Sequence, residues 1–406
     1  MQVRTAPFYM VPMASRQFSI TVLVLAQISV LSVWFSSAAV LAEMRDEAGL
    51  TTTDLAWLTT SVQLGFSVGA LGFAALGLAD RFDPRRVFCI SALVAAVANL
   101  GQLWVPIGGS EALALRALTG AALAGVYPVG MKIAVGWSLK NRGLLVGALV
   151  GALTLGSASP HLIALFGGAD WRITIWTTTI ITVLGGLAML WTALGPHHAR
   201  APGLDLGAIR LAWTDKRIRY AILGYLGHMW ELYVFWAWIG VIAGGSFMLA
   251  GAEEAGWLAK LTAFLAVGLG GIACVVCGRW ADRFGKAQVA MWILGLSAVA
   301  SVIAAAGYGG PVWLVMAMLI VWGVLVVPDS PLFSALVADA APPERAGSLM
   351  TLQTSIGFLL TAVTVQATPF AAEALGWPLV LGLMGVGPVL GVLAMRALIR
   401  TTPSAT

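Results

Sequence analysis

The segment Gly77-Leu-Ala-Asp80-Arg81-Phe82 returns about half a chain length later as Arg279-Trp-Ala-Asp282-Arg283-Phe284. A second landmark shows nearly the same displacement, because the interval from Pro128 to Arg142 equals the interval from Pro331 to Arg345. Two agreeing landmarks indicate an internal duplication in which each copy is one structural unit.

The composition is that of a membrane protein. Hydrophobic residues make up 59% of the 406 residues and charged residues only 10%, whereas soluble domains carry roughly 25% charged residues. A bilayer-spanning helix needs about 20 mostly apolar residues, and runs of that length recur along the chain. The predicted fold is an all-α membrane protein with twelve transmembrane helices in two pseudo-symmetric six-helix bundles.

The expected spans form two sets of six. The first set is Phe18–Leu41, Leu55–Ala79, Val87–Trp104, Ala112–Trp137, Leu144–Phe166 and Ile173–Leu194. The second set is Ile218–Ile242, Gly256–Cys277, Val289–Ala306, Val312–Val337, Ser348–Pro369 and Pro378–Arg396. The expected units are therefore a bundle of residues 1–194, a central loop of residues 195–217 and a bundle of residues 218–406.

The central loop is too polar to span a membrane. Within it, Leu206, Ile209, Leu211 and Trp213 are spaced to form one apolar face of a helix on the membrane surface. A disordered linker is the alternative, and either structure joins the two bundles flexibly.

The Lys and Arg residues predict the orientation. With both termini in the cytoplasm, Arg45, Arg172 and Lys260 lie on the outer side and Arg116 and Lys132 lie within a span, while the rest of the 23 Lys and Arg residues lie inside. Cytoplasmic loops carry an excess of Lys and Arg. The prediction is a multi-pass protein of the inner membrane, surrounded by the lipid bilayer.

Several other classes are excluded or disfavoured. The net charge of +5 does not come from a nucleic-acid-binding motif. The first apolar run exceeds a signal peptide's core and lacks a convincing cleavage site. Cys89, Cys274 and Cys277 all fall in expected spans, so they predict helix packing and no disulfide framework or metal site.

The loop after the second expected span carries the most specific motif. Its glycine, Asp-Arg pair and following arginines resemble the loop signature of the major facilitator superfamily, a resemblance that covers essentially the whole chain; the residues are Gly77, Asp80, Arg81, Arg85 and Arg86. Asp83-Pro84 departs from the usual glycine. A partial second copy follows the eighth span and consists of Gly278, Asp282, Arg283, Gly285 and Lys286. An Asp at a helix end can accept a charge-assisted hydrogen bond from Arg and hold one conformation, or it can merely cap a turn.

The fourth and fifth spans carry further resemblances. Arg116 is followed by Gly120, similar to a signature of proton-coupled members, and an intramembrane Arg is functional unless it extends to the interface. The fifth span resembles a glycine-rich signature more frequent in antiporters, carried here by Gly147, Gly151, Gly156 and Pro160. Small residues at this spacing also serve ordinary close packing.

The seventh span holds the most chemically active pair. Glu231 lies ~20 Å from the cytoplasmic end of its helix at 1.5 Å per residue, near the bilayer midplane, and His228 shares its helix face. We expect Glu231 to carry a proton with His228 tuning it; a neutral, hydrogen-bonded structural Glu is the alternative. Trp230 and Tyr233 either line an aromatic cavity with neighbouring Trp residues or simply pack.

The tenth span is interrupted by Pro328-Asp329-Ser330-Pro331, and the fourth has a similar Tyr127-Pro128 step before Lys132. Broken helices often border substrate paths. The resemblance implies that spans one, four, seven and ten surround a central cavity. We predict a cytoplasmic gate between Lys132 and Asp329, against the alternative that Lys132 reaches the interface and Asp329 caps its own helix.

The residues and the resemblance together imply a secondary transporter of a small organic solute, with proton-coupled antiport out of the cell preferred. Proton-coupled uptake of a small anion at Arg116 and Lys132 is one alternative, and a non-transporting assembly or receptor protein on the same fold is another. The expected partners are a small-molecule substrate and protons, with one chain sufficient. Because no phosphate loop, nucleophile motif or metal cluster is present in the sequence, neither an enzyme nor a cofactor is expected.

Overall fold

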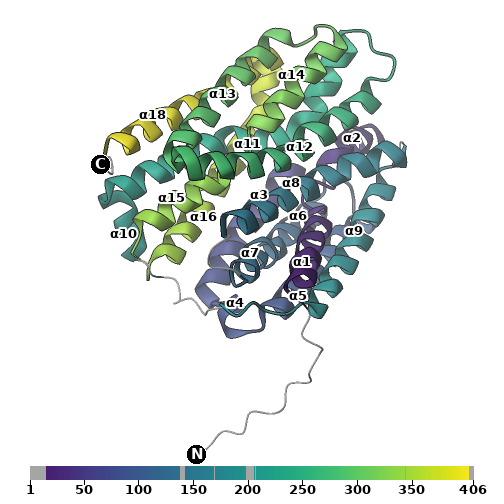
Figure 1. The fold of residues 1–406 in the computed structure, drawn as a ribbon. Helices are drawn as coiled ribbons and strands as arrows, with labels where there is room; N and C mark the ends of the chain where they lie inside the picture. The colour runs from purple at the N-terminus through teal and green to yellow at the C-terminus, as the bar shows by residue number, and fades with distance from the viewer. Residues whose placement is uncertain are drawn as a thin grey trace, which may run out of the picture.

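The computed structural model describes residues 15–137, 142–168, 170–197, 205, 207–342 and 344–401, and within these ranges every regular element is a helix (Figure 1). Eleven helical segments in this part of the chain are long and apolar enough to cross a membrane, and the shorter apolar helix α1 precedes them. The predicted fold class is confirmed.

The N-terminal half contains α1 (Arg16–Leu31), α2 (Leu41–Ala48), α3 (Thr52–Leu76), the short α4 (Leu78–Arg81), α5 (Pro84–Gly101), α6 (Ser110–Leu123), α7 (Tyr127–Val135), α8 (Arg142–Gly167) and α9 (Trp171–Ala188). Single 3-10 turns lie at Ala38–Val40, Gln102–Trp104 and Met189–Trp191. The helix α10 (Gly207–Thr214) precedes the C-terminal half. That half contains α11 (Lys216–Leu249), α12 (Ala255–Phe284), α13 (Lys286–Gly307), α14 (Val312–Leu325), α15 (Ser330–Ala340), α16 (Ala346–Leu375), α17 (Trp377–Met384) and α18 (Val386–Thr401).

Side-chain caps fix where several spans begin. Asp83, Asp170 and Asp215 each accept a hydrogen bond from the backbone N–H two residues later, and Thr51 forms a capping box at the start of α3. These oxygens satisfy backbone donors that have no partner in the first helical turn. Gly77 ends α3 with φ of +60°, a conformation that costs glycine little.

The first span is not the continuous helix that the sequence predicts. Instead of running from Phe18 to Leu41, α1 stops at Leu31, and an irregular stretch leads through the 3-10 turn to α2. Ser36 and Ser37 in this stretch hydrogen-bond to the side chains of Asn99 and Gln102. Neighbouring helices thus supply partners for these hydroxyls, and Arg116 of α6 donates to the backbone carbonyl oxygens of Val33 and Trp34. Such partners permit a break within a membrane.

The fourth and tenth spans break where their prolines predict. The first break separates α6 from α7 just before Pro128, and the second separates α14 from α15 at residues 326–329. Proline has no N–H for the helical ladder and clashes with the preceding turn. Because the two breaks occupy equivalent places in the two copies, they belong to the duplicated unit.

Glycines bring the helices into close contact. A Cβ atom at Gly120 of α6 would lie 2.0 Å from the carbonyl oxygen of Val62 in α3. Between the halves, α8 packs against α12 and α3 against α16, and a Cβ at Gly271 of α12 would lie 2.4 Å from Oγ1 of Thr154 in α8. Small residues at such positions allow helices to approach closely in a membrane.

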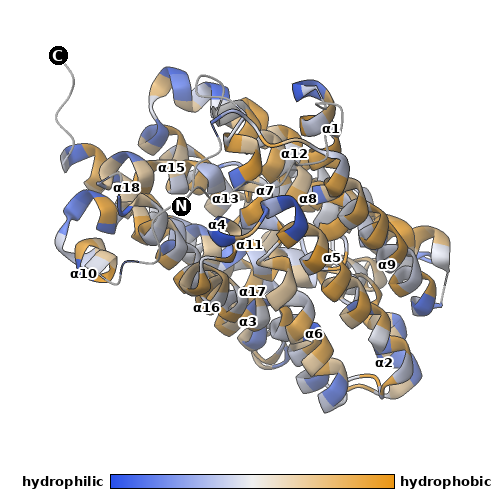
Figure 2. Cartoon of the chain, turned by 90° about the horizontal axis from the view of Figure 1, so that it is seen from below, coloured by the Kyte–Doolittle hydropathy of each residue, from blue (hydrophilic) through white to orange (hydrophobic). Residues whose placement is uncertain are grey.

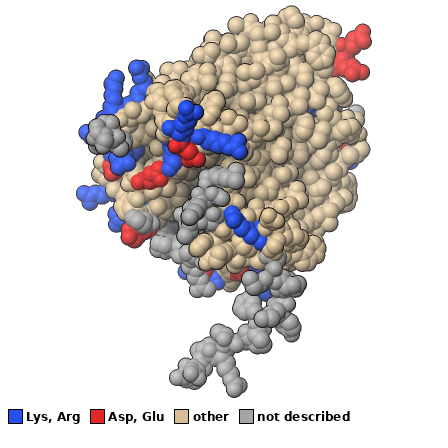
Figure 3. Space-filling model, viewed as in Figure 1, with Lys and Arg blue, Asp and Glu red and all other residues tan. Residues whose placement is uncertain are grey.

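The charged residues divide between the two ends of the bundle. One end, here called the basic end, carries Arg81, Arg86, Arg217, Arg283, Arg345 and Arg400. The opposite end, called the acidic end, carries Glu43, Glu47, Glu111, Glu253, Glu254 and Glu373. Figure 3 shows Lys and Arg gathered near α10 and α18, Asp and Glu at the upper right, and a broad uncharged surface between them. Polar residues likewise concentrate at helix ends and connections in Figure 2.

The helix α10 lies at the basic end against α11 and α16. Its buried residues are Ala208 and Ala212, whereas Ile209 and Trp213 are 46% and 49% exposed. The predicted helix is present; its small alanines face the protein, and Ile209 and Trp213 of the predicted apolar face lie on the outside. Leu206 lies outside the described residues.

Candidate functional site

Glu231 is buried inside the C-terminal half. It lies on α11 with 1% of its surface exposed, and its carboxylate accepts hydrogen bonds from Ser297 Oγ at 2.6 Å and Trp322 Nε1 at 3.1 Å. Ser297 lies on α13 and Trp322 on α14, so three helices enclose the carboxyl group. Both donors are uncharged, which leaves any negative charge on Glu231 without a cationic hydrogen-bond partner among these contacts.

His228 and Asp329 form a second buried pair, one turn from Glu231. Nδ1 of His228 lies 2.9 Å from Oδ1 of Asp329, and the side chains are 0% and 2% exposed. Neither of these two atoms forms a hydrogen bond, so the pair is a close contact between two buried ionisable groups. Asp329 lies in the break between α14 and α15, where the chain leaves the helical ladder. The break therefore brings an acid to the same helix face that carries Glu231.

The predicted gate pair of Lys132 and Asp329 is not formed. Lys132 of α7 instead pairs with Asp80 of α4 and donates to the carbonyl oxygen of Ala79 at 3.1 Å. The spacing of Lys132 and Asp329 from the equivalent arginines predicted their relative depth in the membrane. It did not predict that the short helix α4 places Asp80 beside α7. Lys132 is thus held within the N-terminal half, and Asp329 within the C-terminal half.

The repeated loop motif makes matching contacts in the two halves. In the first copy an Asp of the loop pairs with a Lys of the fourth span; in the second copy Lys286 of the loop pairs with Asp339 of the tenth span at 2.5 Å. The acid and the base have exchanged places between the two copies, but each salt bridge joins the loop to the basic end of the equivalent span, the fourth or the tenth. Within the second copy, Gly278 lies inside α12, and the guanidinium of Arg283 lies 5.1 Å from the ring centre of Phe284.

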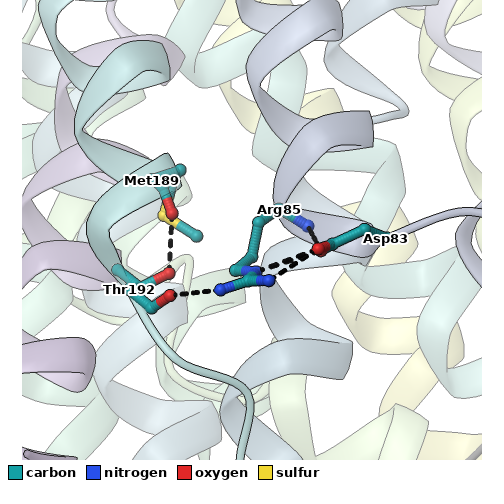
Figure 4. Close-up of polar contacts among 4 residues, drawn as sticks. All are labelled: Asp83, Arg85, Met189 and Thr192. Carbon is teal, nitrogen blue, oxygen red and sulfur yellow. Dashed lines mark hydrogen bonds and ion pairs between the residues drawn. The ribbon is translucent and has the colours of Figure 1, made fainter. Parts of the chain in front are cut away.

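The departure at Asp83 has a structural role (Figure 4). Asp83 caps α5 and forms a salt bridge of 2.6 Å with Arg85, whose Nη1 donates to the carbonyl oxygen of Thr192 at 2.7 Å. Thr192 in turn donates from Oγ1 to the carbonyl oxygen of Met189. Burial alone raises the pKa of Asp83, but the hydrogen bonds and charge of Arg85 outweigh it, and the net pKa is lowered. Arg85 thereby fixes the loop to the end of the sixth span.

Arg116 supports the break in the first span. It is 1% exposed and donates to the carbonyl oxygens of Val33 at 3.0 Å and Trp34 at 2.5 Å, and to Ser36 Oγ at 3.2 Å. These acceptors lie just past the carboxyl end of α1, where the helix dipole favours a cation. The alternative that Arg116 extends to the interface is excluded by its burial.

The glycines of the fifth span have different neighbours. A Cβ at Gly156 would lie 2.7 Å from the carbonyl oxygen of Ile28 in α1, and one at Gly151 would lie 3.3 Å from that of Gly271 in α12. Gly147 has no such neighbour within 4 Å, and Pro160 lies inside α8. Gly151 therefore serves the contact between the halves and Gly156 the contact with α1.

Trp230 and Tyr233 face different surroundings. Trp230 is 37% exposed, and its Nε1 donates to the carbonyl oxygen of Leu383 in α17. Tyr233 is buried between the two halves, where it belongs to a group of six aromatic rings in mutual contact that we call the aromatic clasp. The clasp consists of Trp34, Phe35 and Phe66 from the N-terminal half and Tyr233, Trp236 and Phe358 from the C-terminal half.

A charged contact at the acidic end also joins the halves. Lys260 of α12 pairs with Glu43 of α2, and its Nζ also lies 3.5 Å from the carbonyl oxygens of Ala164 and Gly168 at the carboxyl end of α8. Among the described residues this is the single ion pair between the halves. Nearby, Thr52 of α3 donates to Glu373 of α16. Glu43 and the three clasp residues of the N-terminal half were not predicted, because residues far apart in the chain give no signal of contact.

Comparison with known proteins decides the family. The sequence profile of the Major Facilitator Superfamily matches residues 22–364 and 250–406, which covers most of the chain. The chain belongs to the major facilitator superfamily. It is accordingly a membrane transporter of small solutes and not an enzyme.

Solved structures of the superfamily share its fold. A D-xylose-proton symporter superposes with a TM-score of 0.75 at 15% identity, over 96% of this chain and 98% of the symporter. An inward-facing bacterial homologue of the human lysosomal transporter Spinster superposes with a TM-score of 0.73 at 13% identity, over 96% and 99% of the two chains. At these identities the likeness shows the fold alone.

Two curated relatives match shorter segments. A multidrug transporter of Candida glabrata is 34% identical over 107 residues, which are 26% of this chain and 18% of the relative. A glucose transport protein of Synechocystis sp. is 25% identical over 178 residues, which are 40% and 38% of the two chains. The chain thus spans well under half the length of either superfamily relative in these matches.

Proposed function

We propose that this superfamily member is a proton-coupled antiporter that exports a small organic solute from the cytoplasm, acting as a monomer. In this proposal residues 1–194 and 218–406 are the two moving bundles and residues 195–217 join them. The protein lies in the inner membrane, and its basic end and both termini face the cytoplasm. This orientation follows from the enrichment of Lys and Arg in cytoplasmic loops. The similarity to a multidrug transporter supports the direction of transport.

The observation that carries the proposal is the buried carboxyl group of Glu231. A carboxylate enclosed by three helices with only neutral donors is costly in a membrane, whereas its protonated form is not. Such a group can take up a proton when its side of the protein opens and release it when solvent or substrate access changes. His228, one turn away, and its neighbour Asp329 place a second pair of buried ionisable groups in the same bundle.

The contacts between the halves support alternating access. The ion pair of Lys260 with Glu43 and the bond of Thr52 with Glu373 both lie at the acidic end, and the aromatic clasp lies below them. At the basic end, Lys132, Lys286 and Arg345 pair with acids of their own half or of the central loop. The described polar contacts between the halves therefore lie at the acidic end, which supports a mechanism in which the basic end opens while the acidic end stays closed.

Uptake is the second candidate, and the glucose transport protein among the relatives favours it. Uptake of an anion at Arg116 and Lys132 has less support, because protein acceptors already occupy both cations. A non-transporting receptor or assembly protein would not need the buried acid of Glu231. Flux in reconstituted vesicles separates these functions.

The test is proton-driven flux in proteoliposomes with an imposed pH gradient, read by an internal pH dye and by labelled solute. We expect Glu231→Gln to abolish gradient-driven accumulation while exchange of solute across the membrane continues. Glu254→Gln, which changes an acid at the acidic end outside this site, is the matched control and should transport normally. Full gradient-driven accumulation by Glu231→Gln would remove Glu231 from the mechanism.

A further inference from the structure

His161 is a buried histidine without a hydrogen-bond partner. It lies on α8 with 1% of its surface exposed, and both Nδ1 and Nε2 are unpartnered. A buried polar group without a partner costs the fold free energy, so such groups are rare in native proteins. The imidazole of His161 therefore calls for a functional explanation.

The imidazole lies between the two halves, just below their ion pair. A Cβ atom at Gly240 of α11 would lie 3.9 Å from Cε1 of His161. Three residues further along α8, the carbonyl oxygen of Ala164 lies 3.5 Å from Nζ of Lys260, which pairs with Glu43. Three residues advance a helix by about 4.5 Å, so His161 lies roughly one turn below this ion pair. Because helices of the other half cover the imidazole, separation of the halves at the acidic end must uncover it.

The surroundings make a proton on this imidazole unfavourable while the acidic end is closed. Lys260, one turn away, repels a second cation, and burial opposes any charge on the ring. The other charged side chains near this end of α8 are paired with Lys260 or with one another; they are Glu43, Glu47, Asp170 and Arg172. The stretch of α11 from 232 to 249 and α1 beyond its first residue carry no charged side chain. His161 is thus neutral in the closed form.

We propose that His161 is a proton-binding site that becomes accessible when the acidic end opens, and that a proton bound there keeps this end open. A hydrated imidazole takes up a proton near pH 6.5. The resulting cation must lose its water and approach Lys260 again before the halves can close, which is costly. Acid on this side of the membrane therefore favours the open form. The inference rests on the proposed alternating access and adds a site of pH control to it.

The distance between spin labels at Asp46 and Glu253 tests the site in the detergent-solubilised, full-length protein, without solute or gradient. Both positions are exposed at the acidic end, and the three native cysteines are replaced first. The ratio of open to closed protein should rise about tenfold between about pH 6.5 and about pH 5.5, because the open form binds one more proton. His161→Gln should keep its pH 8 distance distribution throughout, since glutamine does not titrate. A distribution at pH 8 equal to that of the parent protein shows that this variant is folded.

His197→Gln is the matched control, since it removes an exposed histidine at the basic end and should leave the pH response unchanged. An undiminished response in His161→Gln, a response lost only in His228→Gln, or an acidic end that closes as the pH falls would each overturn the proposal. Lys260→Gln at pH 8 should open the acidic end without acid. If it does so while the parent protein shows no pH response, the proton site is wrong and alternating access stands.

Discussion

Arg116 supports the aromatic clasp through hydrogen bonds to the main chain of the first span. Its guanidinium binds the carbonyl oxygens of Val33 and Trp34, the same stretch of chain that presents Trp34 and Phe35 to the C-terminal half. The sequence suggested either a role in proton coupling or an Arg that extends to the interface, and neither suggestion includes this contact. Arg116 is a positioning residue for the aromatic clasp.

Replacement of Arg116 should therefore destabilise the protein. Hydrogen bonds from a charged group are worth roughly 1.5–3 kcal/mol each, and Arg116→Gln loses two or more of them. We expect a clear fall in the melting temperature, with Arg116→Lys intermediate because it keeps the charge but loses the planar fork. Arg172→Gln at the exposed acidic end is the control and should cost much less. Unchanged melting of Arg116→Gln would show that the break in the first span needs no such support.

Lys132 and Asp80 give a second prediction for single residues. Their ion pair replaces the predicted gate, so a charge exchange within this pair is the appropriate test. Lys132→Asp and Asp80→Lys should each slow transport, and the double variant should recover part of the rate, as expected for two interacting sites. The combination of Lys132→Asp with Asp329→Lys should show no recovery. If transport recovered in the Lys132 and Asp329 double variant but not in the Lys132 and Asp80 double variant, the gate between Lys132 and Asp329 would be supported instead.

Contacts within one helix could be predicted from the sequence, whereas contacts between helices could not. His228 and Glu231 lie three apart on one helix, so the sequence alone places them on one face. The partners Ser297, Trp322 and Asp329 come from other helices, and their rotation and height relative to α11 are not encoded in local spacing.

At the scale of elements, the helix α2 acts as a strap at the acidic end. Glu47 of α2 binds Arg172 through two hydrogen bonds of 2.6 and 2.9 Å and accepts a third from Nε1 of Trp171. Its neighbour Glu43 reaches across to Lys260 of the other half. The first contact fixes α2 to its own half, and the second connects the halves.

The Glu47 contact predicts a pH dependence. The hydrogen bonds of Arg172 and then Trp171 lower the pKa of Glu47 below its ordinary 4.5. A group with a lowered pKa stabilises the fold above its ordinary pKa, and that stabilisation is lost as the pH falls through the lowered value. The melting temperature of the wild-type protein should thus fall below about pH 4.5 by more than that of Glu47→Gln. Parallel curves for the two proteins would contradict this contribution.

The breaks in the first, fourth and tenth spans differ in how well the sequence predicts them. Pro128 and Pro331 predicted the breaks of the fourth and tenth spans, because proline acts locally on its own helix. The first span has no proline or glycine at its break, and its serines are compatible with an intact helix. There the break depends on Arg116, Asn99 and Gln102 from other helices, so a local pattern could not predict it.

At the scale of the whole molecule, the duplication and the charge distribution carry most of the argument. Two copies of a six-helix unit place equivalent breaks and loop contacts in both halves, and the chain length and apolar composition predicted this arrangement. The closing contacts are not duplicated, since Glu43 and Lys260 have no counterpart pair between the halves at the basic end of the described residues. This asymmetry supports a state that is closed at the acidic end.

Alternating access is tested most directly by measuring the two ends at once. In a background with Cys89, Cys274 and Cys277 replaced, one pair of spin labels at Asp46 and Glu253 reports on the acidic end, and another at Arg81 and Asp339 reports on the basic end. Breaking the ion pair with Lys260→Gln should lengthen the first distance and shorten the second, and the double variant with Glu43→Gln should behave in the same way. Distances that change together, or an acidic end that stays closed without Lys260, would contradict the account.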